Sequence, residues 1–371
     1  DVNDTWGGFD CPTFHIGCYS KDTEIYTKNG WELIKDVKIG DLVLTLIPKS
    51  KQLEWNKIIN TVSYEQNKIV HLTNKQTSFD MLVSKNHPYF GYKIIDKGRK
   101  GRIKEPIWYD DISKISPSFT FYTSSKWVGK EKEIININGE ILKTKDYCKL
   151  MGYYLSEGYA VERGENWYQI SIAQSREKNY DKYIKIYEDL KSLNIKLYPC
   201  KEGILFNNVN IGKYLIKFGK SYEKYIPEEI KELPKEYIKI FLDTFLLGDG
   251  TVQRGKIWKG SKFKNKRIYY TSSKRMADDL GELIIKIGKS VSYELRKTKG
   301  KKAKFKNGSY TINHDSWVIN ELTSRYKNYY NIKSEIVNYN DLVYDVEVEN
   351  HTILTRRNGK VIWGSNCMCD M

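Results

Sequence analysis

Two stretches of the chain share one pattern of apolar and polar positions. Residues 146–158 and 237–250 are each an apolar run with helix-like spacing that ends in an acidic residue followed directly by glycine. The acidic residues are Glu157 and Asp249. The pattern predicts two helices, and the glycine after each acidic residue is expected to end its helix with a left-handed cap.

The segments that follow these two stretches also correspond to one another. Residues 170–175 and 268–273 are strand-like, end in polar residues and precede an amphipathic stretch. Each half therefore reads as helix, strands and helix, which indicates an internal repeat within an α+β domain. Gly152 and Gly248 lie inside the two acid-ended helices, where the lack of a side chain would let the helices pack closely.

Length and composition favour a globular protein of more than one domain. A chain of 371 residues exceeds the usual size of a single hydrophobic core, and its hydrophobic content of 40% supports close packing. It has no apolar run of about 18 residues, and its first residues lack the pattern of a signal peptide, so neither a membrane span nor secretion is expected. The cysteine spacing does not indicate a disulfide framework, and we predict a cytoplasmic location that keeps thiols reduced.

The net charge of +16 is concentrated in one segment. Residues 254–306 contain eighteen Lys and Arg against four acidic residues, and apolar and aromatic residues are interleaved with them. This interleaving favours β-strands that contact the phosphates and grooves of DNA, although a solvated surface loop is the alternative. The residues expected to contact DNA are Lys256, Lys259, Lys262, Lys264, Lys266, Arg267, Lys274 and Arg275.

Four further motifs lie towards the ends of the chain, in the stretches 18–43, 82–88, 343–351 and 364–367. Cys18 opens the segment that Asn366 closes. A Cys can attack the carbonyl before it through sulfur, and an Asn side-chain amide can attack its own backbone carbonyl and break the chain. The segment between them could therefore excise itself. The candidate catalytic residues in these motifs are Cys18, Ser84, His87, Asp345, His351, Ser365, Asn366 and Cys367.

With these four motifs in this order, residues 18–366 resemble an intein of the Hint fold. The two acid-ended helices look like the paired LAGLIDADG motifs of homing endonucleases. The resemblance implies a mostly β, horseshoe-like Hint splicing domain with an inserted α+β LAGLIDADG domain of pseudo-twofold symmetry. The implied divisions are an N-extein fragment at 1–17, the splicing domain at 18–130 and 331–366, the endonuclease domain at 131–330 and a C-extein fragment at 367–371.

The resemblance implies how the first peptide bond is broken. Cys18 would attack the carbonyl of Gly17 and convert the amide into a thioester. Ser84 and His87 would polarise and distort this peptide, and His87 would protonate the departing amine. Ser84 stands where the family has Thr.

The resemblance also implies the later steps. Cys367 would take over the acyl group while Asp345 moves protons, and Asn366 would then cyclise and release the segment. Inteins usually have His where this chain has Ser365. His351 is therefore expected to activate Asn366. Splicing of the host protein's exteins would need no cofactor.

For the middle segment, the resemblance implies a monomeric endonuclease that cuts double-stranded DNA at the intein-free host allele. Glu157 and Asp249 would hold Mg²⁺, because converging carboxylates repel unless a divalent cation lies between them. Lys224 would contact the scissile phosphate or activate water, although a solvated or DNA-positioning lysine is the alternative. Thr244 stands where the motif usually has Gly and would loosen the helix contact. A splicing element whose middle binds nucleic acid without cleaving it also remains open.

Overall fold

The computed structural model describes residues 17–366 apart from 75–77, 97, 99–100, 256, 259–260, 263–264 and 306–307. Of the predicted site residues, Cys367, Lys256, Lys259 and Lys264 lie outside the described residues. The chain divides into two compact units, one continuous, Ser124–Arg325, and one formed by the flanking parts, up to Thr123 and from Tyr326 onward. Among the described helices, none is long and apolar enough to cross a bilayer.

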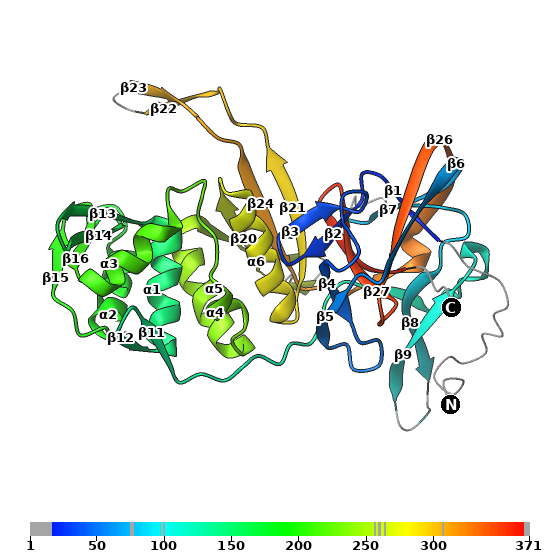
Figure 1. Ribbon diagram of the computed structural model, residues 1–371, viewed down its shortest axis with the longest axis horizontal. Coiled ribbons are helices and arrows are strands. Elements are labelled where there is room, and N and C mark those ends of the chain that lie inside the picture. Colours follow the sequence, from blue (N-terminus) through cyan, green and yellow to red (C-terminus); the bar gives the residue numbers. More distant parts are fainter. Residues whose placement is uncertain are drawn as a thin grey trace. The chain divides into compact units, whose positions relative to one another are not determined.

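The unit formed by the two flanking parts is built almost entirely from strands (Figure 1). Its strands are β1 (Tyr19–Ser20), β2 (Glu24–Thr27), β3 (Gly30–Leu33), β4 (Leu42–Leu46), β5 (Leu53–Lys57), β6 (Asn60–Asn74), β7 (Asp80–Val83), β8 (Tyr89–Asp96), β9 (Arg102–Tyr109), β10 (Phe119–Tyr122), β25 (Tyr326–Asn328), β26 (Ile332–Glu347), β27 (Thr352–Arg357) and β28 (Lys360–Ser365). Two 3-10 turns, η2 (Ile112–Lys114) and η4 (Tyr329–Asn331), complete the set of its described helical turns.

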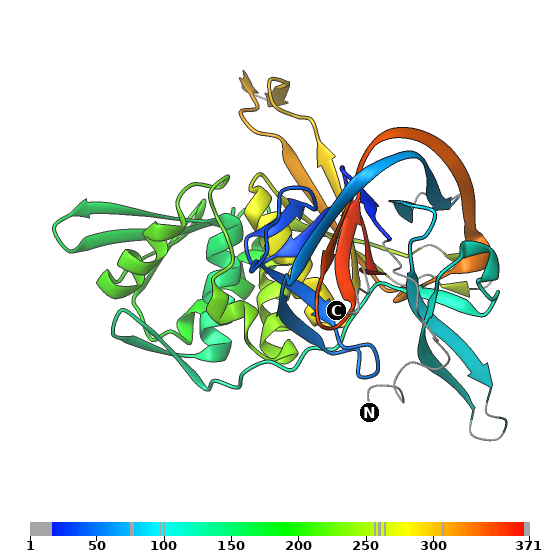
Figure 2. The same ribbon diagram turned by 45° about the vertical axis from the view of Figure 1, so that its right-hand side comes forward.

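Each sheet of this unit combines strands from both ends of the chain. β1, β26, β6 and β7 close into a small barrel, and β28, β27, β2, β4 and β5 follow one another in a second sheet, with β3 paired to β2. β25, β10, β8 and β9 form a third sheet. Figure 2 shows the two longest strands, β6 and β26, curving alongside one another. Neither end of the chain can therefore complete the unit alone.

The core of this unit draws on both ends as well. Ile25 and Val43 from the first part pack in one buried cluster with Ile353 and Ile362 from the last part. Burying such side chains stabilises by about 1.5–3 kcal/mol each. The fold therefore depends on apolar contacts between residues more than three hundred positions apart.

The continuous unit contains the described α-helices, and its ribbon runs from green through yellow to orange in Figure 1. Its helical elements are α1 (Thr144–Glu157), α2 (Tyr180–Lys191), α3 (Val209–Leu215), η3 (Ile216–Phe218), α4 (Glu228–Lys231), α5 (Lys235–Asp249) and α6 (Lys274–Lys286). Its strands are β11 (Ile134–Ile137), β12 (Glu140–Lys143), β13 (Gly158–Gly164), β14 (Trp167–Ala173), β15 (Leu197–Cys200), β16 (Gly203–Asn207), β17 (Gly250–Gln253), β18 (Ile257–Trp258), β19 (Ser261–Lys262), β20 (Lys266–Thr271), β21 (Ser290–Arg296), β22 (Lys302–Phe305), β23 (Gly308–Thr311) and β24 (Ser316–Leu322).

The two halves of this unit share one topology. In each half a helix leads into two strands, then a second helix and two more strands, if the short hairpins β18–β19 and β22–β23 are set aside. The sheet orders are β13-β14-β16-β15 and β17-β20-β24-β21, so the first, second, fourth and third strands are neighbours in both. This repetition agrees with the internal repeat read from the sequence. The pseudo-twofold axis itself stays a prediction.

The first helices of the two halves, α1 and α5, approach closely at their glycines. A Cβ added to Gly152 would collide with the Thr244 hydroxyl and lie 3.0 Å from the carbonyl oxygen of Phe241. A Cβ added to Gly248 would collide with the hydroxyl of Ser156. The Thr244 side chain fills the space that Gly152 leaves, and its hydroxyl donates to the carbonyl of Phe241 at 2.8 Å. A contact looser than the one glycine would give stays a prediction.

The predicted left-handed caps are absent at the ends of both helices. Gly158 has φ −95° and ψ 154°, and Gly250 has φ −146° and ψ 170°, so both glycines are extended and begin the next strand. A Cβ on Gly158 would lie 2.6 Å from the Cα of Tyr154, and one on Gly250 would lie 2.7 Å from the carbonyl oxygen of Leu246. Glycine is needed here because the strand folds back over the last helical turn.

A Gly152→Ala substitution is expected to destabilise the continuous unit. Its methyl group would overlap the Thr244 side chain, and overpacking of this kind costs about 1–3 kcal/mol. The free energy of unfolding in urea measures the effect, with Gly164→Ala as the control because the space around Gly164 is open. The loss in free energy of unfolding should be smaller in a Thr244→Gly background. An equal loss in both backgrounds would contradict this packing of Gly152 against Thr244.

Candidate functional site

The first candidate site lies where β1 runs between β7 and β26. Tyr19 pairs with a residue of each neighbouring strand. Continuing both registers by one residue brings Cys18 opposite Ser84 on one side and Asp345 on the other. The Cys18 N–H donates to Ser84 Oγ at 2.9 Å, and the Ser84 N–H donates to the Cys18 carbonyl at 2.8 Å. The fold therefore brings together three residues that the sequence motifs place far apart.

The backbone of Gly17 lies against the residues that follow Ser84. A Cβ on Gly17 would lie 2.5 Å from the Cα of His87 and would collide with Pro88. The His87 ring is fully buried, and it packs edge-on against Tyr19 and Tyr89 at centroid distances of 4.4 Å and 5.6 Å. Neither ring nitrogen has a hydrogen-bond partner among the residues that the structure describes.

Burial determines the charge of His87. It lowers the pKa of the ring to about 3, although the nearby backbone of Gly17 opposes the fall. The ring is therefore neutral at neutral pH, with one N–H to donate and one nitrogen to accept. A protonated His87 acting as an acid, as the sequence suggested, would need a change in its surroundings.

Asn366 directly follows β28, and His351 directly precedes β27, the strand that pairs with β28. Thr352 pairs with Ser365, so His351 and Asn366 both adjoin the last pair of this ladder, and His351 turns away from the strand with a left-handed backbone, φ 49°. The Asn366 side chain is fully buried, and neither its Oδ1 nor its Nδ2 has a partner among the described residues. An unsatisfied buried amide costs about 1–3 kcal/mol. No hydrogen bond to a described residue therefore has to break before the Asn366 side chain can turn toward its own carbonyl carbon.

Two hydrogen bonds connect Ser365 to residues near the beginning of the segment. Its hydroxyl donates to the carbonyl of Pro88, and its carbonyl accepts from the Tyr19 hydroxyl at 2.6 Å. The Ser365 hydroxyl is thus used as an anchor for the backbone. Sequence motifs did not reveal Tyr19 or Pro88, because their partners lie about three hundred residues away.

The second candidate site lies at the ends of α1 and α5. Burial, and after it the charge of Glu157, raise the pKa of the Asp249 carboxyl to about 7, although Lys224 opposes the rise. Burial also raises the pKa of Glu157, against the effect of Lys182 and Lys224. The two predicted carboxylates therefore lie close enough to influence one another in a partly dry site.

Lys224 belongs to the same site. Its ammonium group is buried and donates to the carbonyls of Tyr154 and Gly158, both at 2.7 Å. Burial lowers the pKa of Lys224 to about 8, although Asp249 and Glu157 oppose the fall. The alternative of a solvated surface lysine is therefore wrong.

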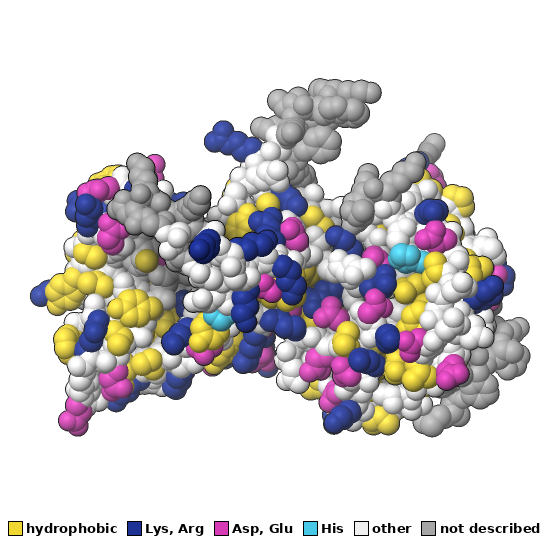
Figure 3. All heavy atoms as spheres, turned by 90° about the horizontal axis from the view of Figure 1, so that it is seen from above, with side chains coloured by type: hydrophobic (Ala, Val, Ile, Leu, Met, Phe, Trp, Pro, Cys, Tyr) yellow, Lys and Arg dark blue, Asp and Glu magenta, His cyan; other side chains and the backbone are white. Residues whose placement is uncertain are grey.

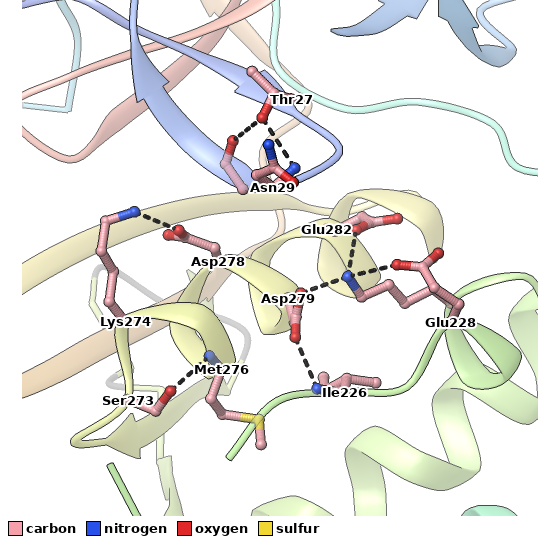
Figure 4. A network of polar contacts seen from close by, with 12 residues as sticks. Thr27, Asn29, Ile226, Glu228, Ser273, Lys274, Met276, Asp278, Asp279 and Glu282 are labelled. Atoms are coloured by element: carbon pink, nitrogen blue, oxygen red, sulfur yellow. Dashed lines mark hydrogen bonds and ion pairs between the residues drawn. The ribbon is translucent and has the colours of Figure 1, made fainter. Parts of the chain in front are cut away.

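A network on α6 holds the loop that carries Lys224. The Ser273 hydroxyl donates to the Lys224 carbonyl at 2.7 Å, and the N–H of Ile226 donates to Asp279 at 2.7 Å. Figure 4 shows Asp279 pointing toward Ile226. The other oxygen of Asp279 lies 2.5 Å from the Lys231 ammonium. The sequence did not reveal these supporting residues, because Asp279 reads as one more charge on an amphipathic helix.

The residues predicted to contact DNA differ in their surroundings. Arg267 is paired with Asp243 at 2.6 Å and with Glu321 at 3.5 Å, and Lys274 is paired with Asp278 at 2.8 Å.

Three more of the residues predicted to contact DNA are described: Arg275, which lies beside an aromatic ring, and two lysines on strands. The Arg275 guanidinium lies 3.9 Å from the centre of the Tyr225 ring, whereas Lys262 and Lys266 lie in β19 and β20. On the face seen in Figure 3, basic side chains are interspersed with acidic ones. Of the predicted contact residues, Arg267 and Lys274 are therefore already paired with acidic side chains.

Comparison with known proteins gives distant relatives. No family model matches the chain. The DNA-directed RNA polymerase subunit beta C-terminal section of Stigeoclonium helveticum is 24% identical over 95% of this chain and 36% of its own length. The ribonucleoside-diphosphate reductase subunit beta of Aquifex aeolicus is 21% identical over 94% of this chain and 50% of its own length. The chain thus spans half the length or less of these curated relatives.

Solved structures similar to part of the chain are inteins. The gp41-1 intein is 17% identical, covers 29% of this chain and 68% of its own, and has a TM-score of 0.20. A DnaB intein from Synechocystis sp. PCC 6803 is 16% identical, covers 29% of this chain and 69% of its own, and has a TM-score of 0.22. Each of these similarities covers less than a third of this chain.

Proposed function

We propose that residues 18–366 form a self-splicing intein that excises itself and joins its flanks. One observation carries the proposal. The two residues at which the chain would break, Cys18 and Asn366, are both fully buried in one unit, and their neighbours Tyr19 and Ser365 share a hydrogen bond of 2.6 Å. An ordinary β domain has no need to bury two such ends side by side.

The curated relatives support the same proposal. They are named for unrelated activities, yet each matches nearly the whole of this chain and at most half of its own length. A segment carried inside different host proteins accounts for this pattern, whereas a shared enzymatic activity does not.

In the first step, the sulfur of Cys18 attacks the carbonyl carbon of Gly17, and the bond to the Cys18 nitrogen breaks. Ser84 holds the N–H of that nitrogen at 2.9 Å. Neutral His87 would donate its N–H to the Gly17 oxygen as this atom gains negative charge, which is the stabilisation that an oxyanion hole provides. We expect Asp345 to accept the thiol proton of Cys18 and to return it to the Cys18 nitrogen as the bond to Gly17 breaks.

In the later steps, the sulfur of Cys367 takes the acyl group from Cys18. The Asn366 side-chain nitrogen then attacks its own carbonyl carbon, and the bond to Cys367 breaks. His351 would protonate this departing amine. A final shift of the acyl group from sulfur to nitrogen joins Gly17 to Cys367 by a peptide bond.

A His351→Ala substitution is expected to slow the cyclisation of Asn366 by about 10²-fold or more, the scale of one general acid-base group. The branched intermediate should accumulate, because the earlier steps do not use this side chain. Time courses on denaturing gels measure both species. As a control, cleavage at Cys18 by added thiol should proceed at the parental rate. Release of the segment at the parental rate would show that another residue activates Asn366.

Splicing is tested by expressing the chain between two longer foreign flanks under reducing conditions. The expected products are the joined flanks and the free segment. Recovery of the precursor alone, at several temperatures, would contradict the proposal.

We further propose that the continuous unit is a LAGLIDADG homing endonuclease that cuts double-stranded DNA. The observation that favours cleavage over binding alone is the partly dry pair Glu157 and Asp249. Burial raises the pKa of both carboxyls, and the charge of Glu157 also raises the pKa of Asp249. A proton or a divalent cation relieves such repulsion, and hard carboxylate oxygens suit Mg²⁺. Bound there, Mg²⁺ would supply a Lewis acid and lower the pKa of water. Lys224, with a pKa of about 8, can exchange a proton near neutral pH.

A plasmid that carries the uninterrupted host sequence separates the two alternatives for this unit. Linearisation that requires Mg²⁺ is expected from an endonuclease. Binding that is sensitive to salt, without any cut, would instead identify a unit that only binds DNA.

A further inference from the structure

Tyr19 joins the two ends of the proposed splicing segment. It follows Cys18 on β1, in the small barrel, and its hydroxyl donates to the carbonyl of Ser365 on β28, in another sheet, at 2.6 Å. Its ring packs edge-on against His87 with centroids 4.4 Å apart. One side chain thus contacts a residue of the first reaction and fixes the peptide that leads into Asn366.

The surroundings of the Tyr19 hydroxyl are shaped to receive it. A Cβ on Gly364 would collide with the hydroxyl oxygen, so glycine leaves the space that the phenol occupies. The hydroxyl of Ser365 is bonded to the carbonyl of Pro88, next to His87. The hydroxyl and the carbonyl of Ser365 are therefore both bonded to residues near the start of the segment. The side-chain amide of Asn366 has no partner among the described residues.

We propose that Tyr19 is a positioning residue for the cyclisation of Asn366. Its hydroxyl fixes the peptide between Ser365 and Asn366, which restricts the backbone rotation that brings the Asn366 nitrogen to its own carbonyl carbon. The inference rests on the splicing function proposed above. Cyclisation requires the two reacting atoms about 3–3.5 Å apart, and a misplacement of about 1 Å can cost on the order of 10² in rate.

A Tyr19→Phe substitution tests the proposal in two backgrounds that isolate the two chain breaks. With Cys18→Ala, only cleavage after Asn366 is measured, and we expect it to slow by about 10-fold to 10²-fold. With Asn366→Ala, only thiol-induced cleavage before Cys18 is measured, and we expect its rate to stay within about twofold of its parent, because the ring that packs on His87 is retained.

Two further variants sharpen the test. Tyr89→Phe is the matched control, since Tyr89 also packs on His87, but its buried hydroxyl has no partner among the described residues. Both cleavage rates should be unchanged in this variant. Gly364→Ala pushes the Tyr19 hydroxyl away from the opposite side and should slow cleavage after Asn366 as Tyr19→Phe does.

The outcomes are distinguishable. If the parent chain does not splice, the proposed function fails before the inference is tested. If the parent splices and Tyr19→Phe cleaves after Asn366 at the parental rate, the inference is overturned. An equal loss of both cleavage rates in Tyr19→Phe would also overturn it, because a general loss of packing affects both ends.

Discussion

A Cys18→Ala substitution is expected to abolish ligation of the flanks. Alanine has no nucleophile to attack the Gly17 carbonyl, and removal of a nucleophile from a coupled catalytic group costs on the order of 10⁴-fold or more. Slow cleavage after Asn366 should persist, because His351 and Asn366 adjoin β27 and β28, outside the barrel that contains β1, and remain intact. Denaturing gels of the precursor between longer flanks would measure both products.

The matched control is Cys200→Ala. Cys200 is another free cysteine, but it lies in the continuous unit, where its thiol donates to the carbonyl of Gly203 at 3.0 Å. This variant should ligate its flanks at the parental rate. Ligation by the Cys18→Ala protein would mean that a different residue begins the reaction.

Asp249→Asn or Glu157→Gln is expected to reduce the rate of double-strand cleavage by at least about 10²-fold to 10³-fold. Each substitution replaces a charged carboxylate that would hold Mg²⁺ with a neutral amide. Splicing should continue, since both residues belong to the unit that carries none of the described splicing residues. Plasmid linearisation measures the first effect and ligation the second. Glu236→Gln, an exposed acid in the first turn of α5, should leave both activities unchanged.

The fold of the Asp249→Asn protein can be checked by its pH dependence. The folded-state pKa of Asp249 is raised from 3.8 to about 7, so the folded protein binds this proton more tightly than the unfolded chain does. Without metal, the free energy of unfolding therefore falls as pH rises between these two values. The full loss is reached at about pH 8. The variant does not lose this free energy of unfolding, because Asn does not ionise. At that pH it should unfold at a urea concentration no lower than its parent does. Earlier unfolding would assign the lost cleavage to misfolding.

Elements with strong periodicity could be predicted from the sequence. The helices that end at Glu157 and Asp249, and the repeat that follows them, are present because their apolar spacing determines which face can be buried. The expected left-handed caps at Gly158 and Gly250 are wrong, because the general preference for such caps takes no account of the strand that folds back on each helix.

The residues that support the candidate sites could not be predicted in this way. Tyr19 and its partner Ser365 are 346 positions apart, and no local pattern pairs them. The burial of Lys224 depends on carbonyls at the end of α1 and the start of β13, and its loop is held by Asp279. Motifs identified groups that could react, whereas hydrogen bonds between distant segments determine how those groups are held.

The most direct test of the central claim is the intact mass of the segment released from a precursor with longer flanks. Excision by cyclisation of Asn366 predicts a species that begins at Cys18, ends at Asn366 and is one water lighter than the free acid, together with the joined flanks. A released species with a free carboxyl terminus from the outset, or ends at other residues, would contradict self-excision and point to cleavage by a protease.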